Sequence, residues 1–160
     1  MTSEDSGDPD DSGHPRLQPP PRNRMVVAVL ALIGLFIALY LLSYALGLVP
    51  LLCGVSSCET VQMSEWAKVG PVPVPALGVL GYASILGLAM LGLQPAFADS
   101  RAIGLLIFGL AAVGVAYSAF LTYLEAAVID AWCIWCIASA VVMTLVFLAS
   151  LPELRRGART

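Results

Sequence analysis

Charged side chains are scarce in this 160-residue chain, and its apolar stretches contain almost none of them. Asp, Glu, Lys and Arg make up 12% of the residues, whereas hydrophobic residues make up 59%. Soluble domains usually carry about 25% charged residues. The composition therefore excludes an ordinary water-soluble domain, and the length is enough for one domain.

The net charge of −3 comes from the N-terminal segment. Acidic residues cluster there: Glu4, Asp5, Asp8, Asp10 and Asp11. Without them the chain is slightly basic, so no global charge signal indicates nucleic-acid binding. Residues 1–24 are rich in Asp, Ser, Gly and Pro and poor in apolar residues, which predicts a disordered acidic tail.

Histidine occurs once, as His14 in that tail, and the chain carries no cofactor motif. A zinc site would therefore need a cluster of cysteine thiolates beside lipid, so we expect no metal. The apolar stretches have no charged residue in their interiors. This argues against a transporter or channel, because a charged translocation path is missing.

Four apolar stretches are long enough to cross a bilayer, which takes about 20 residues. They are 25–49, 76–93, 102–124 and 131–151. Backbone groups in hydrocarbon need internal partners, so we predict an all-α membrane protein, a four-transmembrane-helix bundle over residues 25–151. The small pairs Ala83/Gly87 and Ala112/Ala116 are expected to allow tight helix contact. The first stretch is longer than the 7–15 or so apolar residues of a signal peptide and lacks a following cleavage site, so we expect it to be retained.

The basic residues predict the topology. Only Lys68 falls on one side; the other side carries Arg16, Arg22, Arg24, Arg101, Arg155, Arg156 and Arg159. The positive-inside rule then places both termini in the cytoplasm, including a basic tail at 152–160. We expect a multi-pass protein of the inner or plasma membrane, with residues 50–75 and 125–130 on the extracytoplasmic side.

The predicted outer segment 50–75 is the longest connection, and long loops in compact proteins are often functional. Residues 57–67 are expected to form a short helix on the membrane surface, with Val61 and Trp66 as apolar contacts. Prolines at 71, 73 and 75 predict an extended, polyproline-like segment. Pro75 suits the first turn of the second span.

All four cysteines, Cys53, Cys58, Cys133 and Cys136, fall on this predicted outer face, where disulfides persist. Cys133 and Cys136 form a C-x-x-C at a helix start, so their sulfurs share a face and can close a disulfide. The positive potential of a helix N-terminus favours a thiolate, the attacking species in disulfide exchange. Asp130 is predicted to cap this helix and bond the Cys133 amide.

The two cysteine pairs suggest a relay. Cys53 and Cys58 flank a loop with one Gly and two Ser, which lets a disulfide be offered to a soluble partner. Electrons would enter at Cys53, pass from Cys58 to Cys133 and leave from Cys136 to a lipid-soluble quinone. A small membrane scaffold with two structural disulfides is the alternative that spacing alone leaves open.

Other conspicuous side chains have ordinary interpretations. Tyr44, Tyr123, Trp66, Trp132 and Trp135 fit an aromatic belt at the membrane interface. Flat aromatic walls also suit a quinone, so the three tryptophans are candidate quinone contacts, Trp132 and Trp135 foremost because they flank cysteines. Glu125 is interpreted as an interfacial charge in preference to a proton donor, and Tyr82 and Tyr117 as packing residues.

The motifs taken together resemble bacterial members of the vitamin K epoxide reductase family. They are the segment CGVSSCETVQMSEW from Cys53 to Trp66, LG-x-x-GY from Leu77 to Tyr82, and CIWC from Cys133 to Cys136. The similarity runs from about Met25 to Leu151. The combination is specific, although C-x-x-C alone is a weak signal.

The resemblance implies a four-helix bundle around a quinone, with the outer loop as a lid. Cys133 and Cys136 would be the active-site pair, with Cys136 facing the quinone, and Cys53 and Cys58 the shuttle pair. Ser64 matches a loop serine that supports the site by hydrogen bonding. The implied task is to reoxidise a DsbA-like or thioredoxin-like protein and reduce ubiquinone or menaquinone. Because the sequence ends soon after the fourth span, we expect that partner to be separate.

Two departures from the vertebrate enzymes bear on the substrate. Those enzymes carry an Asn near the start of the second span, whereas the only Asn here is Asn23. They carry a Tyr one turn after the C-x-x-C, where this chain has Ala140. Both departures argue against epoxide reduction and leave quinone reduction in place.

Overall fold

The computed structural model describes residues 22–54, 57–97 and 100–157, with side chains described as far as Pro152. Residues 1–21, which make up most of the predicted disordered tail, lie outside the described residues. The basic tail predicted at 152–160 is described only as backbone up to Gly157, apart from Pro152.

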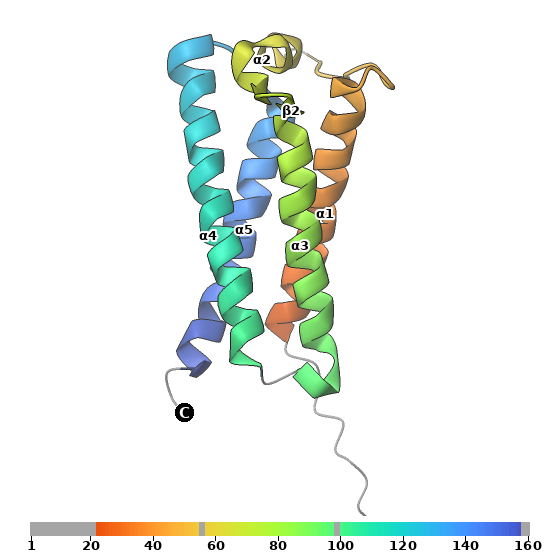
Figure 1. The fold of residues 1–160 in the computed structure, drawn as a ribbon. Helices are drawn as coiled ribbons and strands as arrows, with labels where there is room; N and C mark the ends of the chain where they lie inside the picture. Colours follow the sequence, from red (N-terminus) through yellow and green to blue (C-terminus); the bar gives the residue numbers. More distant parts are fainter. Residues whose placement is uncertain (1–21, 55–56, 98–99, 158–160) are drawn as a thin grey trace, which may run out of the picture.

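Among the described residues, four long helices run side by side as a bundle (Figure 1). They are α1 (Arg22–Ala45), α3 (Val74–Leu93), α4 (Arg101–Leu124) and α5 (Ile134–Gly157). Each contains a stretch that is long and apolar enough to cross a membrane. The predicted all-α membrane bundle is therefore confirmed, as expected for a chain whose backbone polar groups must be satisfied within lipid.

The helix ends differ from the predicted spans where the backbone turns sharply. The first helix ends at Ala45 rather than Val49, and Gly47 follows with φ +73°, a conformation that favours glycine. The helix α3 begins at Val74 with Pro75 in its first turn, as predicted. The last helix begins at Ile134 rather than Ala131, because the chain leaves a left-handed Asp130 and reaches α5 through non-helical residues.

The bundle core is built on small residues that let the helices approach closely. Ala31, Ala38, Ala89 and Ala111 are all at most 4% exposed. The small residues predicted for this role are different ones, and that prediction is wrong: Ala83, Gly87 and Ala116 face outward.

Tyr82 ties three helices together in this core. It is 1% exposed, and its hydroxyl donates to the Ser139 carbonyl oxygen of α5 over 2.8 Å. Its ring lies against Gly34 of α1, where a Cβ atom would overlap it. Tyr82 is therefore a packing residue, as predicted.

The connection between α1 and α3 covers one end of the bundle (Figure 1). It contains α2 (Cys58–Met63), the 3-10 turn η1 (Glu65–Ala67), and the paired strands β1 (Lys68–Val69) and β2 (Val72–Pro73). The predicted short helix is confirmed, but the predicted polyproline segment is a tiny hairpin that turns at Gly70 with φ +63°. We call this the cysteine end; α1 begins and α5 ends at the opposite end (Figure 1).

A buried arginine closes that opposite end. Arg24 of α1 is 5% exposed, and its guanidinium donates to the carbonyl oxygens of Gly92 (2.7 Å), Phe97 (3.0 Å) and Ser100 (3.2 Å). These acceptors belong to the last turn of α3 and to the connection into α4. The arginine thus satisfies carbonyls that a helix end leaves without intrahelical partners.

Candidate functional site

The tertiary structure brings both cysteine pairs together at the cysteine end. Cys58 and Cys133 are 0% exposed and pack with Val61 and Ala131 in a small apolar cluster. Cys53 and Cys136 are half-buried against that cluster. Pairs that are far apart in sequence therefore share one site.

Cys133 is the residue immediately before α5 and therefore stands at the N-cap position of that helix. The backbone amide of Cys136 donates to the Cys133 sulfur over 3.4 Å, so the sulfur takes the place of the usual capping oxygen. The side chain of Cys136, that amide and the Cys58 side chain form hydrogen bonds that lower the pKa of Cys133 to about 7, against the opposing effect of burial. A thiolate at Cys133 is thus favoured near neutral pH.

The Cys133 amide is bonded by Glu125, not by Asp130, so the predicted cap is wrong. Cys133 N donates to Glu125 Oε2 over 3.1 Å. Asp130 instead ends the π-helical turn η3 (Glu125–Ile129) in a left-handed conformation, φ 51°, and is exposed. Glu125 is 3% exposed, so its interpretation as an interfacial charge is also wrong.

The loop pair lies next to the helix pair through Cys58. Burial, followed by a hydrogen bond with Cys58, raises the pKa of the Cys53 thiol to about 12. Cys58 in turn forms a hydrogen bond with Cys133. The contacts between the cysteines therefore run in the order Cys53, Cys58, Cys133, Cys136. The backbone amide of Ser57, just before α2, donates to the Trp132 carbonyl oxygen over 3.1 Å.

Two aromatic residues hold the loop that carries Cys53. The Tyr40 hydroxyl accepts from Leu52 N at 2.8 Å, and Trp135 Nε1 donates to the Leu52 carbonyl oxygen at 3.0 Å. The rings of Tyr40 and Trp135 lie 5.0 Å apart. Trp135 therefore anchors the loop, while Trp132 is 49% exposed.

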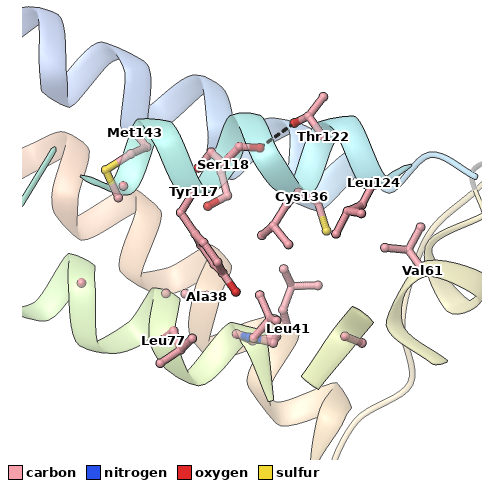
Figure 2. A pocket seen from close by; sticks show the side chains of 18 of the residues that line it. Ala38, Leu41, Val61, Leu77, Tyr117, Ser118, Thr122, Leu124, Cys136 and Met143 are labelled. Carbon is pink, nitrogen blue, oxygen red and sulfur yellow. Dashed lines mark hydrogen bonds between the residues drawn. The ribbon is translucent and has the colours of Figure 1, made fainter. Parts of the chain in front are cut away.

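An apolar cavity of about 390 Å³ lies beside the cysteines, lined by all four long helices and by the loop. Cys136 is the only one of the four cysteines among its lining residues. Figure 2 shows Tyr117 and Cys136 pointing toward it from α4 and α5. Of the three candidate tryptophans, Trp66 lines the cavity, whereas Trp132 and Trp135 do not.

Residues 25–151 match the model of the vitamin K epoxide reductase family. The chain belongs to this family. The match spans all of the described cysteines and most of the chain. Membership in the vitamin K epoxide reductase family supports a membrane redox enzyme, which is consistent with four cysteines gathered at one end of a membrane bundle.

Ser64, the predicted supporting serine, lies at the end of α2. Ser64 Oγ donates to the Val61 carbonyl oxygen over 2.7 Å, and Ser64 also lines the cavity. Its hydrogen bond holds the C-terminal turn of the helix that begins with Cys58. The described residues contain no group of three or more His, Cys, Asp or Glu side chains placed to hold a metal ion.

Two residues of the site, Gln62 and Tyr40, escaped the sequence analysis as functional candidates, and a third, Glu125, was considered there only as the less favoured proton donor. Gln62 Nε2 donates to Cys136 Sγ over 3.8 Å, Tyr40 holds the loop, and Glu125 contacts the helix pair. For Glu125 a signal was present, because an ionisable residue at the edge of an uncharged span is a functional candidate by default. Gln62 and Tyr40 carry no comparable pattern.

Proposed function

We propose that this family member is a quinone-dependent thiol–disulfide oxidoreductase that reoxidises a separate DsbA-like or thioredoxin-like protein. Its electrons would pass to ubiquinone or menaquinone, which supports disulfide formation in secreted proteins. One observation carries the proposal: Cys136 faces the apolar cavity and connects through Cys133 and Cys58 to Cys53 in the loop.

Thiol–disulfide exchange along this series balances. A partner thiolate attacks the Cys53–Cys58 disulfide, and a second partner thiol resolves the mixed disulfide, which leaves Cys53 and Cys58 reduced. The Cys58 thiolate then attacks Cys133 of the Cys133–Cys136 disulfide, and Cys53 resolves the bond between the pairs. The reduced Cys133–Cys136 pair gives two electrons and two protons to the quinone, and hydroquinone leaves.

The cavity has suitable properties for a quinone head group. Its volume of about 390 Å³ lies in the range of about 300–1,000 Å³ that is typical of ligand sites. Its lining is mainly apolar, with a few polar groups that include Gln62, Tyr117 and Ser118. The tyrosine position of the vertebrate enzymes is Ala140 here, so we assign the phenol that donates to a quinone oxygen to Tyr117, which projects from α4 (Figure 2).

We also propose that the cysteine end faces the extracytoplasmic side. Arg22, Arg24 and Arg101 lie at the opposite end of the bundle, while Lys68 lies at the cysteine end. Fusing a phosphatase that needs disulfides, or a fluorescent protein that needs the cytoplasm, to the C-terminus tests this. Fluorescence without phosphatase activity is expected, and the reverse pattern contradicts it.

The function is tested with the purified full-length protein in detergent. A reduced DsbA-like protein supplies electrons, a short-chain ubiquinone or menaquinone accepts them, and hydroquinone formation is followed by absorbance. Quinone-dependent oxidation of the partner is expected, and Cys136→Ser should abolish it while the protein stays folded. If neither quinone is reduced and both cysteine pairs resist mild thiols, the structural-disulfide alternative holds instead.

A further inference from the structure

Glu125 is a carboxyl group buried beside the two sulfurs of the helix pair. Its Oε2 accepts the Cys133 amide hydrogen at 3.1 Å, and the Cys136 thiol lies within hydrogen-bonding reach of the same carboxyl. Both Glu125 and Cys136 line the apolar cavity. The carboxyl therefore connects the last sulfur of the series to the space beside it.

The helix is locally distorted at Glu125. Glu125 begins the π turn η3, and its carbonyl oxygen accepts the amides of Asp130 and Ala131. Single π turns often occur at functional sites, because they displace side chains from the regular helix register. Here the turn ends α4 with the Glu125 side chain directed back toward the start of α5.

A structural role as an ion pair does not account for this burial. A buried carboxylate is costly unless it is compensated by hydrogen bonds or an opposite charge. At the cysteine end the described basic residue is Lys68, which is exposed on β1. The contacts of the Glu125 carboxyl given above are with the Cys133 amide and the Cys136 thiol, so its surroundings are those of a group that exchanges a proton.

We propose that Glu125 is a catalytic residue that accepts the proton of the Cys136 thiol and delivers it to a quinone oxygen. This inference rests on the proposed quinone reduction. As the Cys133–Cys136 disulfide forms, two electrons pass to the quinone. The proton from Cys136 travels through Glu125 to one quinone oxygen. The other quinone oxygen takes a proton from water, to which the ionised Cys133 has already released its own, so the product is neutral hydroquinone.

The position of Glu125 satisfies the requirements of a general acid–base. Such a group must lie within hydrogen-bonding reach of the proton that it moves, and Glu125 meets this at Cys136. It must also reach the acceptor, and it lines the cavity where we place the quinone. Its backbone amide donates to carbonyl oxygens of the preceding turn of α4, and its carbonyl oxygen accepts the amides of Asp130 and Ala131, so the carboxyl is positioned before the reaction.

Several titratable groups share these surroundings and enter the pH dependence of the step. Cys133 and Cys136 face Glu125 from α5. Cys58 approaches the same cluster from α2, and Tyr82 and Tyr117 line the cavity from α3 and α4. A limb of the pH profile is therefore assigned to Glu125 only if it disappears on substitution of Glu125.

The test separates the two half-reactions of the full-length protein in detergent. Glu125→Gln keeps the size and an oxygen for the Cys133 amide but cannot exchange a proton. We expect single-turnover reduction of ubiquinone by the pre-reduced variant to slow about 100-fold, a typical contribution of general acid–base catalysis. Exchange with the reduced DsbA-like protein and the melting temperature should stay near those of wild type, and the pH profile of the quinone step should lose one limb.

Two further variants sharpen this test. Glu125→Asp keeps an ionisable group and should recover part of the rate, and Glu59→Gln, an exposed acid on α2, should match wild type. Suppose that the wild-type protein reduces quinone. If Glu125→Gln then reduces quinone as fast as wild type, or is slowed equally in both half-reactions, this inference alone is overturned. A wild-type protein that reduces no quinone overturns the proposed function together with it.

Discussion

The sulfur of Cys133 accepts a hydrogen bond from the backbone amide of Cys136 over 3.4 Å. One residue thus caps α5 and belongs to the proposed redox pair, because the chain enters the helix immediately after Cys133. The first turn of a helix presents amides without intrahelical partners, and these stabilise negative charge. The neighbouring Glu125 opposes this effect, yet the hydrogen bonds prevail and lower the pKa of Cys133.

We predict that the reduced protein contains one thiolate that titrates near pH 7. An ordinary cysteine has a pKa of about 8.5, so about 3% would be ionised at pH 7. For Cys133, with a pKa of about 7, the ionised fraction is about one half and rises with pH. Ultraviolet thiolate absorbance, followed against pH, should show a step that Cys133→Ser removes.

Cys53 provides the internal contrast for this titration. Its pKa is raised to about 12, so it should remain protonated throughout the same range of pH. Replacing Cys53 by Ser should therefore leave the step near pH 7 in place. Persistence of the step in Cys133→Ser would assign the thiolate to another cysteine and refute the capping argument.

A second prediction concerns the cavity. Gly81 lines it, and a Cβ atom at this position would meet no atom within 4 Å, so Gly81→Leu should extend into the cavity without a clash in α3. We expect the KM for quinone to rise about tenfold, a loss of about 1.4 kcal/mol in binding. Exchange with the thiol partner should be unchanged.

Gly87→Leu is the matched control for the cavity. Gly87 lies on the same helix, is exposed and also has open space at its Cβ, but it does not line the cavity. Steady-state quinone kinetics of the two variants should differ accordingly. Equal KM values for both variants would place the quinone elsewhere.

A third prediction concerns the end of the bundle opposite the cysteines. Arg24→Ala removes three hydrogen bonds and leaves one buried carbonyl group of α3 and two part-buried carbonyl groups of its connection without that donor. Bonds to charged groups contribute about 1.5–3 kcal/mol each, and water replaces some of them, so we expect a loss of about 2–4 kcal/mol in the free energy of unfolding. Thermal unfolding in detergent measures it.

Arg22→Ala serves as the control for Arg24→Ala, because it removes the same charge two residues earlier from an exposed position. Its melting temperature should stay within the error of wild type. If both variants lose the same stability, the effect comes from charge at the membrane surface and not from the Arg24 hydrogen bonds.

Much of the fold could be predicted because lipid restricts the choices. An uncharged run of sufficient length has no stable state in a bilayer except a helix or a closed barrel, so the four spans followed from composition. The helix ends were less predictable. The non-helical entry into α5 depends on a left-handed Asp130, and nothing in the pattern of apolar residues marks that turn.

The sequence by itself determined the four helices, the short helix before Trp66 and the presence of all four cysteines on one side of the spans. Only the tertiary structure decided which groups touch: Glu125 instead of Asp130 on the Cys133 amide, Cys136 facing the cavity, and Trp135 on the loop. The hydrophobicity and the length of a segment are properties of that segment alone, so they can be read from its sequence. A contact across the bundle depends on the rotation and offset of separate helices, which the packing of Tyr82 against Gly34 and of small alanines sets.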